Sequence, residues 1–290
     1  MSQQLKNFLH LNLALVIIAT AGPLGNYIQL PPEVGIFSRT GIAMIAIFIF
    51  IKFKKIPLKF NFKQDGLSFF FCSLLMAIHW VSYFYALQMA GAGLGVISLF
   101  TFPIFTTLLE PVLRKTKFNF LYILLGVWVL FGLYILTPDF NFGNKVTLGI
   151  TMGVFSAISF SIRNILMKDF VEKYHSTLLM FYQNGWVALM LLPVLFFVEF
   201  RLEDWMGQLH FLIFLGVVTT AIGHTYLVNT FQYFSATSVS LLSCIQPIYV
   251  MMMAFFFLGE IPKFNTIIGG LIIISAVVLE TLISKKTKVS

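Results

Sequence analysis

Charged and polar side chains that could bind a solute lie inside long apolar runs of this chain. Arg39 stands about five residues into a run that extends to Phe53. A guanidinium stays charged and offers five hydrogen-bond donors, so it suits an anionic group. In a membrane, Arg39 would either extend to the headgroups or face the interior of a helix bundle, where it would bind helix ends or an anionic solute.

Two sets of side chains each follow one face of a predicted helix. At 100° per residue, the three members of the first set fall within about 60° of one another. The first set is Thr225, Asn229 and Gln232; the second is Val81, Tyr85 and Gln88, with Trp80 and Phe84 beside it. Such groups either hydrogen-bond neighbouring helices or line a central cavity.

Other chemistry receives less support. His79 and His224 lie deep in apolar runs, as packing residues or as groups that contact a substrate or a proton. Their spacing, and that of Cys72 and Cys244, predicts no metal site and no cofactor. The chain has no HExxH, Walker A or GxSxG motif, and no aspartate pair within an apolar run, so no catalytic residues and no enzyme are expected.

The elements that carry these residues must be membrane helices. Hydrophobic residues make up 59% of the 290 residues, charged residues only 10%, and the mean hydropathy is +0.91. A soluble domain has about 25% charged residues. The net charge of +8 sits in short loops, which indicates membrane topology rather than a nucleic-acid partner.

Runs of about 20 apolar residues predict ten transmembrane helices, in an all-α polytopic membrane protein. The predicted spans are 8–29, 34–53, 66–89, 93–113, 119–137, 147–167, 176–198, 209–230, 235–258 and 265–283.

An internal repeat relates the two halves. Adding 144 carries Gly41 to Gly185, Gln88 to Gln232, Pro103 to Pro247 and Gly126 to Gly270, and it places Arg39 on Gln183. The predicted repeats are residues 1–143 and 144–290, with five helices each. Because five is odd, the second repeat would be inverted relative to the first.

Two stretches resemble a known family. "YALQMAGAGLGVISLFTFPIFTTLLEP" and "TFQYFSATSVSLLSCIQPIYVMMMAFFFLGEIPKFNTIIGGLIIISAVVL" are similar to the paired EamA-type repeats of the drug/metabolite transporter superfamily, and "SRTGIAMIAI" resembles that family's arginine-bearing second helix. The resemblance implies transport without defining the substrate. The first half has "LLEPVLRKT" in place of "LGE", so the family glutamate is matched only at Glu260.

Basic residues predict the orientation. With both termini on one side, fourteen of the 19 Lys and Arg residues fall on that side, and only Lys145, Arg201 and Lys263 fall opposite. The positive-inside rule therefore places both termini in the cytoplasm, with the plasma (inner) membrane as the expected location.

Prolines and acids bear on mechanism. Pro23, Pro103, Pro193 and Pro247 would act as hinges or as tolerated kinks. The sequence predicts no acid near the bilayer midplane, which favours gradient-driven or histidine-linked transport over carboxylate-based antiport.

Together these observations predict a transporter that exports small metabolites such as amino acids by alternating access through a central cavity. An importer or exchanger of a vitamin-like solute, sugar nucleotide or drug is the alternative, and a non-transporting membrane assembly protein is the rival class. Expected partners are the solute and membrane lipid, without nucleic acid, in a monomer or homodimer. The expected substrate-binding residues are Arg39, His79, Trp80, Tyr85, Gln88, Gln183, His224, Asn229, Gln232 and Gln246.

Overall fold

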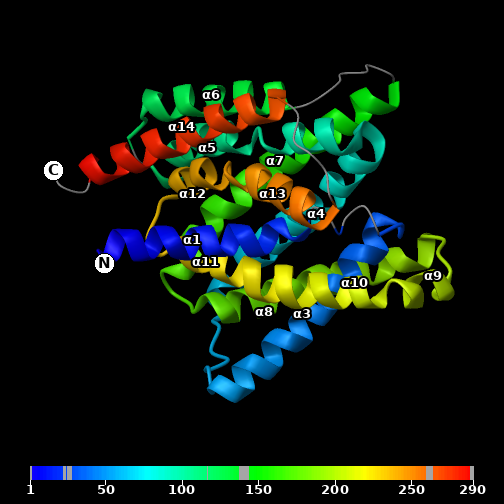
Figure 1. Cartoon of the computed structure of the whole chain (residues 1–290). Helices are drawn as coiled ribbons and strands as arrows, with labels where there is room; N and C mark the ends of the chain where they lie inside the picture. Colours follow the sequence, from blue (N-terminus) through cyan, green and yellow to red (C-terminus); the bar gives the residue numbers. More distant parts are fainter. Residues whose placement is uncertain are drawn as a thin grey trace. The chain divides into compact units, whose positions relative to one another are not determined.

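All regular secondary structure in the described part of the chain is helical, which confirms the predicted all-α class. The computed structural model describes residues 2–21, 24, 28–115, 117–136, 144–258 and 264–287. Its helices are α1 (Gln3–Ala19), α3 (Pro32–Lys54), α4 (Phe62–Leu99), α5 (Phe102–Arg114), α6 (Phe120–Leu136), α7 (Asn144–Val171), α8 (Ser176–Leu191), η1 (Pro193–Phe197), α9 (Leu202–Gly207), α10 (Leu209–Phe214), η2 (Leu215–His224), α11 (Thr225–Thr230), α12 (Ala236–Ser243), α13 (Gln246–Leu258) and α14 (Phe264–Thr287) (Figure 1).

Many of these helices have the length and apolarity of membrane spans. Within the described residues, five segments are long and apolar enough to cross a bilayer: Pro32–Lys54, Phe62–Gly91, Lys145–Val171, Ser176–Phe197 and Leu209–Thr230. Shorter apolar helices cover Phe120–Gly132, Ala236–Val250 and Ile267–Leu279. The protein is therefore a polytopic membrane protein, and helical segments occupy each of the ten predicted spans.

Glycine and proline mark the breaks inside this pattern. Helix α4 runs through the third predicted span into the fourth, with non-helical dihedrals at Gly91 (φ 79°, ψ 164°), a conformation that glycine adopts readily. Pro103 stands in the first turn of α5, Pro193 begins η1 and Pro247 is the second residue of α13. Pro23 and Glu260 lie outside the described residues.

The chain forms two compact units that interleave the sequence halves. Unit 1 comprises Met1–Ala77 and Leu166–Tyr233, and unit 2 comprises Ile78–Ile165 and Phe234–Ser290. The chain passes from one unit to the other three times: within α4, within α7, and between Tyr233 and Phe234.

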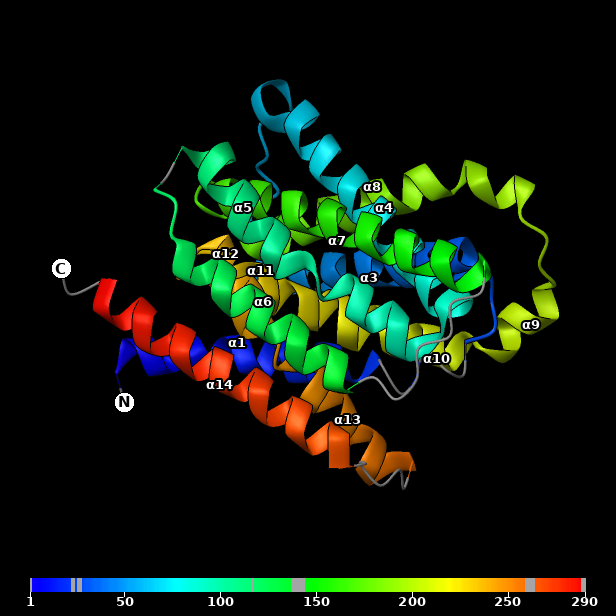
Figure 2. The same ribbon diagram turned by 90° about the horizontal axis from the view of Figure 1, so that it is seen from above.

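In unit 1, α3 packs against α8 and η2, while α1 packs against η2 and α11 (Figure 2). A small core of Leu30, Val34 and Leu212 adjoins Trp205, whose Nε1 donates to Ser38 Oγ at 2.8 Å. Side-chain caps begin two of the helices: Ser2 accepts from the Leu5 amide at the start of α1, and His175 Nδ1 accepts from the Thr177 amide at the start of α8.

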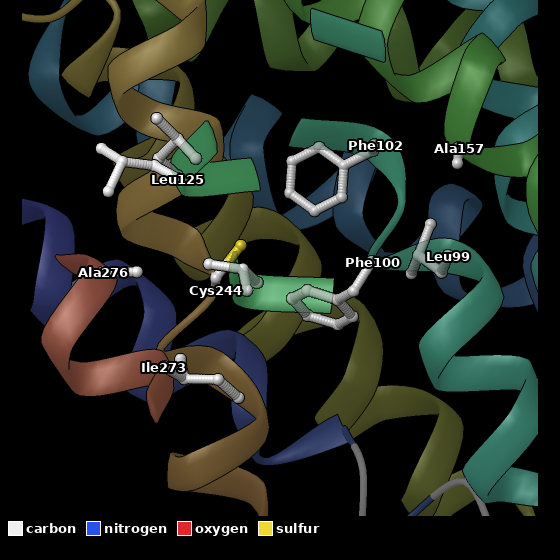
Figure 3. Close-up of a cluster of buried hydrophobic side chains, with 10 residues drawn as sticks. Leu99, Phe100, Phe102, Leu125, Ala157, Cys244, Ile273 and Ala276 are labelled. Atoms are coloured by element: carbon white, nitrogen blue, oxygen red, sulfur yellow. The ribbon is translucent and has the colours of Figure 1, made fainter. Parts of the chain in front are cut away.

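Unit 2 is built around the packing of α6 on α14 and of α12 on α5. Figure 3 shows its core of Leu99, Phe100, Phe102, Leu125, Val129, Ala157, Leu241, Cys244, Ile273 and Ala276. Cys244 is a free thiol at the centre of these apolar side chains, so it acts here as a small packing residue.

Candidate functional site

The ten predicted binding residues divide equally between the two units. Unit 1 holds Arg39, Gln183, His224, Asn229 and Gln232; unit 2 holds His79, Trp80, Tyr85, Gln88 and Gln246. Each set is described within its own unit.

Arg39 lies inside unit 1 with only 5% of its surface exposed. Its Nε donates to Thr220 Oγ1 at 3.0 Å, and that hydroxyl in turn donates to the Leu215 carbonyl at 2.9 Å. The hydroxyl proton of Thr220 is thus committed to Leu215, which leaves a lone pair to accept from the guanidinium. The side chain is bonded within the unit, as the interior interpretation of Arg39 expects.

Thr220 belongs to a π-helix of ten residues, η2. Such helices are rare and commonly mark functional sites. Glycines let neighbouring helices approach it closely: a Cβ on Gly216 would lie 3.0 Å from the Arg39 carbonyl oxygen and 2.7 Å from Ile42 Cγ2. The approach of α3 to η2 therefore depends on the missing side chain of Gly216, and it sets where Arg39 meets Thr220.

Gln183, the repeat counterpart of Arg39, is fully buried on α8. Its Nε2 donates to Cys72 Sγ at 3.8 Å, a weak bond because a thiol is a poor acceptor. The next residue, Asn184, donates to the Met180 carbonyl at 2.7 Å within its own helix. Gln183 and Arg39, which the 144-residue offset pairs, are thus both buried.

The predicted set of polar residues on the eighth span, Thr225, Asn229 and Gln232, is only partly buried. His224 ends η2 and is buried, and the half-buried Asn229 accepts from Ser176 Oγ at 3.5 Å. Among the described residues, the buried Thr225 Oγ1 has no hydrogen-bond partner. Gln232 is exposed in the turn that follows α11.

In unit 2, His79 is bound through both its ring and its backbone to Ser156 on α7. His79 Nδ1 lies 2.8 Å from Ser156 Oγ, and that hydroxyl donates to the His79 carbonyl at 2.9 Å. Because the one hydroxyl proton points to the carbonyl, Nδ1 must be the donor to Oγ, which assigns the neutral imidazole to the Nδ1–H tautomer.

Aromatic rings flank His79. Phe160 stacks on the imidazole with ring centroids 4.3 Å apart, and the Tyr83 ring is nearly parallel to it at 6.2 Å. Trp80 is buried, Tyr85 is half-buried, Gln88 is exposed on α4, and Gln246 is half-buried as the first residue of α13.

The described hydrogen bonds join predicted residues to partners that the sequence interpretation missed: Arg39 to Thr220, Gln183 to Cys72, Asn229 to Ser176 and His79 to Ser156. Hydroxyls are frequent in membrane helices, so their presence alone is a weak signal. His10 was also missed; its ring stacks on Tyr226 with centroids 4.8 Å apart.

Two buried acidic residues have structural partners. Glu110 is buried, and its carboxylate accepts from the amides of Ala236 and Thr237, at 2.9 and 2.7 Å, at the start of α12. Asp65 accepts from Lys173 Nζ at 2.9 Å and from Tyr174 Oη at 2.7 Å. The hydrogen bond with Asp65 raises the pKa of Lys173.

Comparison with known proteins identifies the family. The EamA-like transporter family matches this chain twice, over residues 8–137 and 147–282. The chain belongs to the EamA-like transporter family. The two matches fall on the two predicted repeats, and the expected resemblance is confirmed.

Similar proteins are also transporters by name. An uncharacterized transporter of Archaeoglobus fulgidus is 27% identical over 68% of this chain and 70% of its own length. The pseudopaline exporter CntI of Pseudomonas aeruginosa is 24% identical over 85% of each, and the uncharacterized transporter YoaV of Bacillus subtilis is 24% identical over 86% of each.

One solved structure, titled only "Crystal structure of protein", shares the fold with a TM-score of 0.82 at 13% identity. It covers 97% of this chain and 98% of its own chain, so the likeness extends over the whole fold.

Proposed function

We propose that this transporter exports a small amphipathic metabolite, an amino acid being the first choice, across the plasma membrane by alternating access. Both termini would be cytoplasmic, and the transporter would act as a monomer or homodimer. Membership of a transporter family favours transport over the rival role of a membrane assembly protein and over an enzyme.

The observation that carries the substrate class is the buried Arg39, bonded to Thr220 rather than extended to the surface. A permanent cation inside a membrane protein is costly and usually serves function. It suits a carboxylate, since the guanidinium can bind both oxygens. The amide of Gln183, and the hydroxyl of Thr225, for which the described residues offer no hydrogen-bond partner, would complement the ammonium and other polar groups of a zwitterion.

The proposed direction of transport and the proposed coupling mechanism are supported by different observations. The relative named as the pseudopaline exporter supports export, although gradients alone decide net flux through an alternating-access protein. His79 offers a histidine-linked route, because a proton added at Nε2 would leave the Nδ1–H bond to Ser156 intact. Glu110 is engaged as a helix cap, which keeps carboxylate-based antiport disfavoured.

Counterflow in liposomes tests the proposal. Purified protein is reconstituted into vesicles that are preloaded with one unlabelled solute at a time. The same solute in labelled form is added outside, and its accumulation inside the vesicles is measured. We expect exchange of at least one zwitterionic amino acid. Exchange of a sugar nucleotide or vitamin with no amino acid exchanged would favour the alternative, and no flux of any solute would favour the assembly role.

A further inference from the structure

Unit 1 carries an apolar groove where α3, α4 and α8 meet. The groove has a volume of about 320 Å³ and is lined by Met44, Phe62, Phe181, Tyr182, Gly185, Trp186 and Leu189. Leu189 is 56% exposed at its rim, so the groove opens on the surface of the unit. A Cβ on Gly185 would lie 3.1 Å from Met44 Sδ, so a larger residue at this position would make the groove shallower.

The shape of the groove suits a hydrocarbon chain. Its lining on α8 extends from Phe181 to Leu189, roughly 12 Å at 1.5 Å per residue. The volume is at the lower end of the range for ligand pockets, and the lining offers aromatic and aliphatic contacts. In a membrane helix bundle, a groove of this kind at the surface meets acyl chains.

Lysines gather at one end of the groove. Lys52 Nζ lies 5.3 Å from the centroid of the Phe48 ring, and Phe48 stacks at 5.8 Å on Phe181 of the groove wall. Lys63 directly follows the groove residue Phe62, and Lys54, Lys55 and Lys59 lie between them in sequence, all exposed. The segment 52–64 contains no Asp or Glu, so its charge is uniformly positive.

Aromatic contacts hold this segment against α8. The Phe60 ring lies 4.6 Å from Tyr174 and 5.4 Å from Tyr182, the latter a lining residue, by ring centroids. The ring of Phe62 also meets Tyr182 edge-on at 5.0 Å. The lysines are therefore part of a connection that is packed onto the groove.

We propose that this groove binds an anionic glycerophospholipid, with one acyl chain between α3 and α8 and the phosphate held by Lys52 and Lys63. Basic pockets beside membrane helices attract anionic headgroups, because lysines near the membrane surface favour anionic lipids. A second copy of the chain fits less well, because a symmetric pair would bring two sets of lysines together. A zwitterionic lipid could fill the groove with its acyl chain, but its headgroup has no net negative charge to neutralise the lysines.

Lipid binding is measured on the full-length protein in detergent, by native mass spectrometry and by the shift in unfolding temperature, with phosphatidylglycerol and phosphatidylcholine as probes. We expect phosphatidylglycerol to bind more tightly and to raise the unfolding temperature further. Replacing Lys52 and Lys63 together by Gln should weaken phosphatidylglycerol binding roughly ten- to thirty-fold. The control pair Lys115→Gln and Lys117→Gln removes the same charge from another connection and should bind like the parent.

A second variant pair tests the groove itself. Leu189→Trp would fill it and should reduce bound phosphatidylglycerol, whereas Leu192→Trp, on an exposed residue outside the groove lining, should not. Equal binding of the two lipids, equal losses in both lysine pairs, or a dimer that cross-links through position 189 would overturn the proposal. None of these readouts depends on transport, so the result is independent of the proposed substrate.

Discussion

The hydrogen bond from Arg39 to Thr220 fixes one donor of the guanidinium in place. A guanidinium is planar, and Nε can point at a partner only when the whole group takes one orientation. Thr220 is itself oriented by its bond to Leu215. The cation therefore has a defined direction inside unit 1, which is what recognition of a carboxylate requires.

We expect Arg39→Lys and Arg39→Gln to fold and to lose most transport. Lysine keeps the charge but loses the planar fork, while glutamine is compatible with the helix because Gln183 occupies the matched position of the second repeat. Transport in liposomes should fall about ten-fold or more, with folded yield checked by gel filtration. Arg201→Lys, at an exposed position, serves as the control. Near-normal flux in Arg39→Lys would favour the alternative interpretation, in which Arg39 only anchors its helix at the membrane interface.

Ser156 should matter more for stability than another buried serine of the same helix. Ser156→Ala removes both bonds to His79 and leaves the imidazole donor without this acceptor, at a cost of about 1–3 kcal/mol. Within the part of the chain that the structure describes, Ser159 Oγ donates to the Phe155 carbonyl one turn earlier and to no other group, so Ser159→Ala should change little. Thermal unfolding in detergent compares the two variants, and equal losses would contradict the role given to Ser156.

At the scale of elements, two short helices depend on contacts that are distant in sequence. The eight-residue helix α12 begins on the carboxylate of Glu110, which supplies the negative charge that a helix N-terminus favours. The π-helix η2 contacts α3 at Gly216, where the missing side chain lets the two backbones approach. Neither contact shows in a hydrophobic pattern, because each joins residues more than 120 positions apart.

A close contact between α4 and α7 tests the role of small residues in unit 2. A Cβ on Gly153 would overlap Ser98 Oγ and lie 2.6 Å from Ser98 Cβ. Gly153→Ala should therefore lower stability by about 1–3 kcal/mol through overpacking. Gly41 on α3 has nothing within 4 Å of such a Cβ, so Gly41→Ala should be neutral or gain up to about 1 kcal/mol from helix propensity. A higher unfolding temperature for Gly153→Ala would refute this contact.

The sequence predicts the helices well and their interruptions less well. Apolar runs of about 20 residues locate the spans because the bilayer requires that length. Pro103 and Pro247 lie at breaks, since proline cannot continue the hydrogen-bond ladder. The long α4, whose interior break is at Gly91, and the π-helix were not predicted, because hydropathy does not report which carbonyl an amide bonds.

At the scale of the whole molecule, the repeat in the sequence and the units in the structure divide the chain differently. The family matches separate residues 8–137 from 147–282, whereas each compact unit takes helices from both halves. The fixed offset of 144 residues indicates a duplication because it compares the residue types at corresponding positions of the two sequence halves. The unit boundaries fall inside α4, inside α7 and after Tyr233, and the apolar pattern of the sequence does not mark these positions.

Orientation in the membrane is the prediction that links all of these elements to a cell. Lys59 lies among the lysines of segment 52–64, and the C-terminal "SKKTKVS" carries three more, so the positive-inside rule places both in the cytoplasm. Single cysteines at Lys59 and Ser290 should resist an impermeant thiol reagent in intact cells and react after permeabilisation. The native Cys72 and Cys244 are buried and give little background. Lys145→Cys, at an exposed position near the start of α7 that is predicted to face outward, is the positive control, because it should label without permeabilisation. Ready labelling of position 59 or 290 in intact cells would invert the predicted orientation.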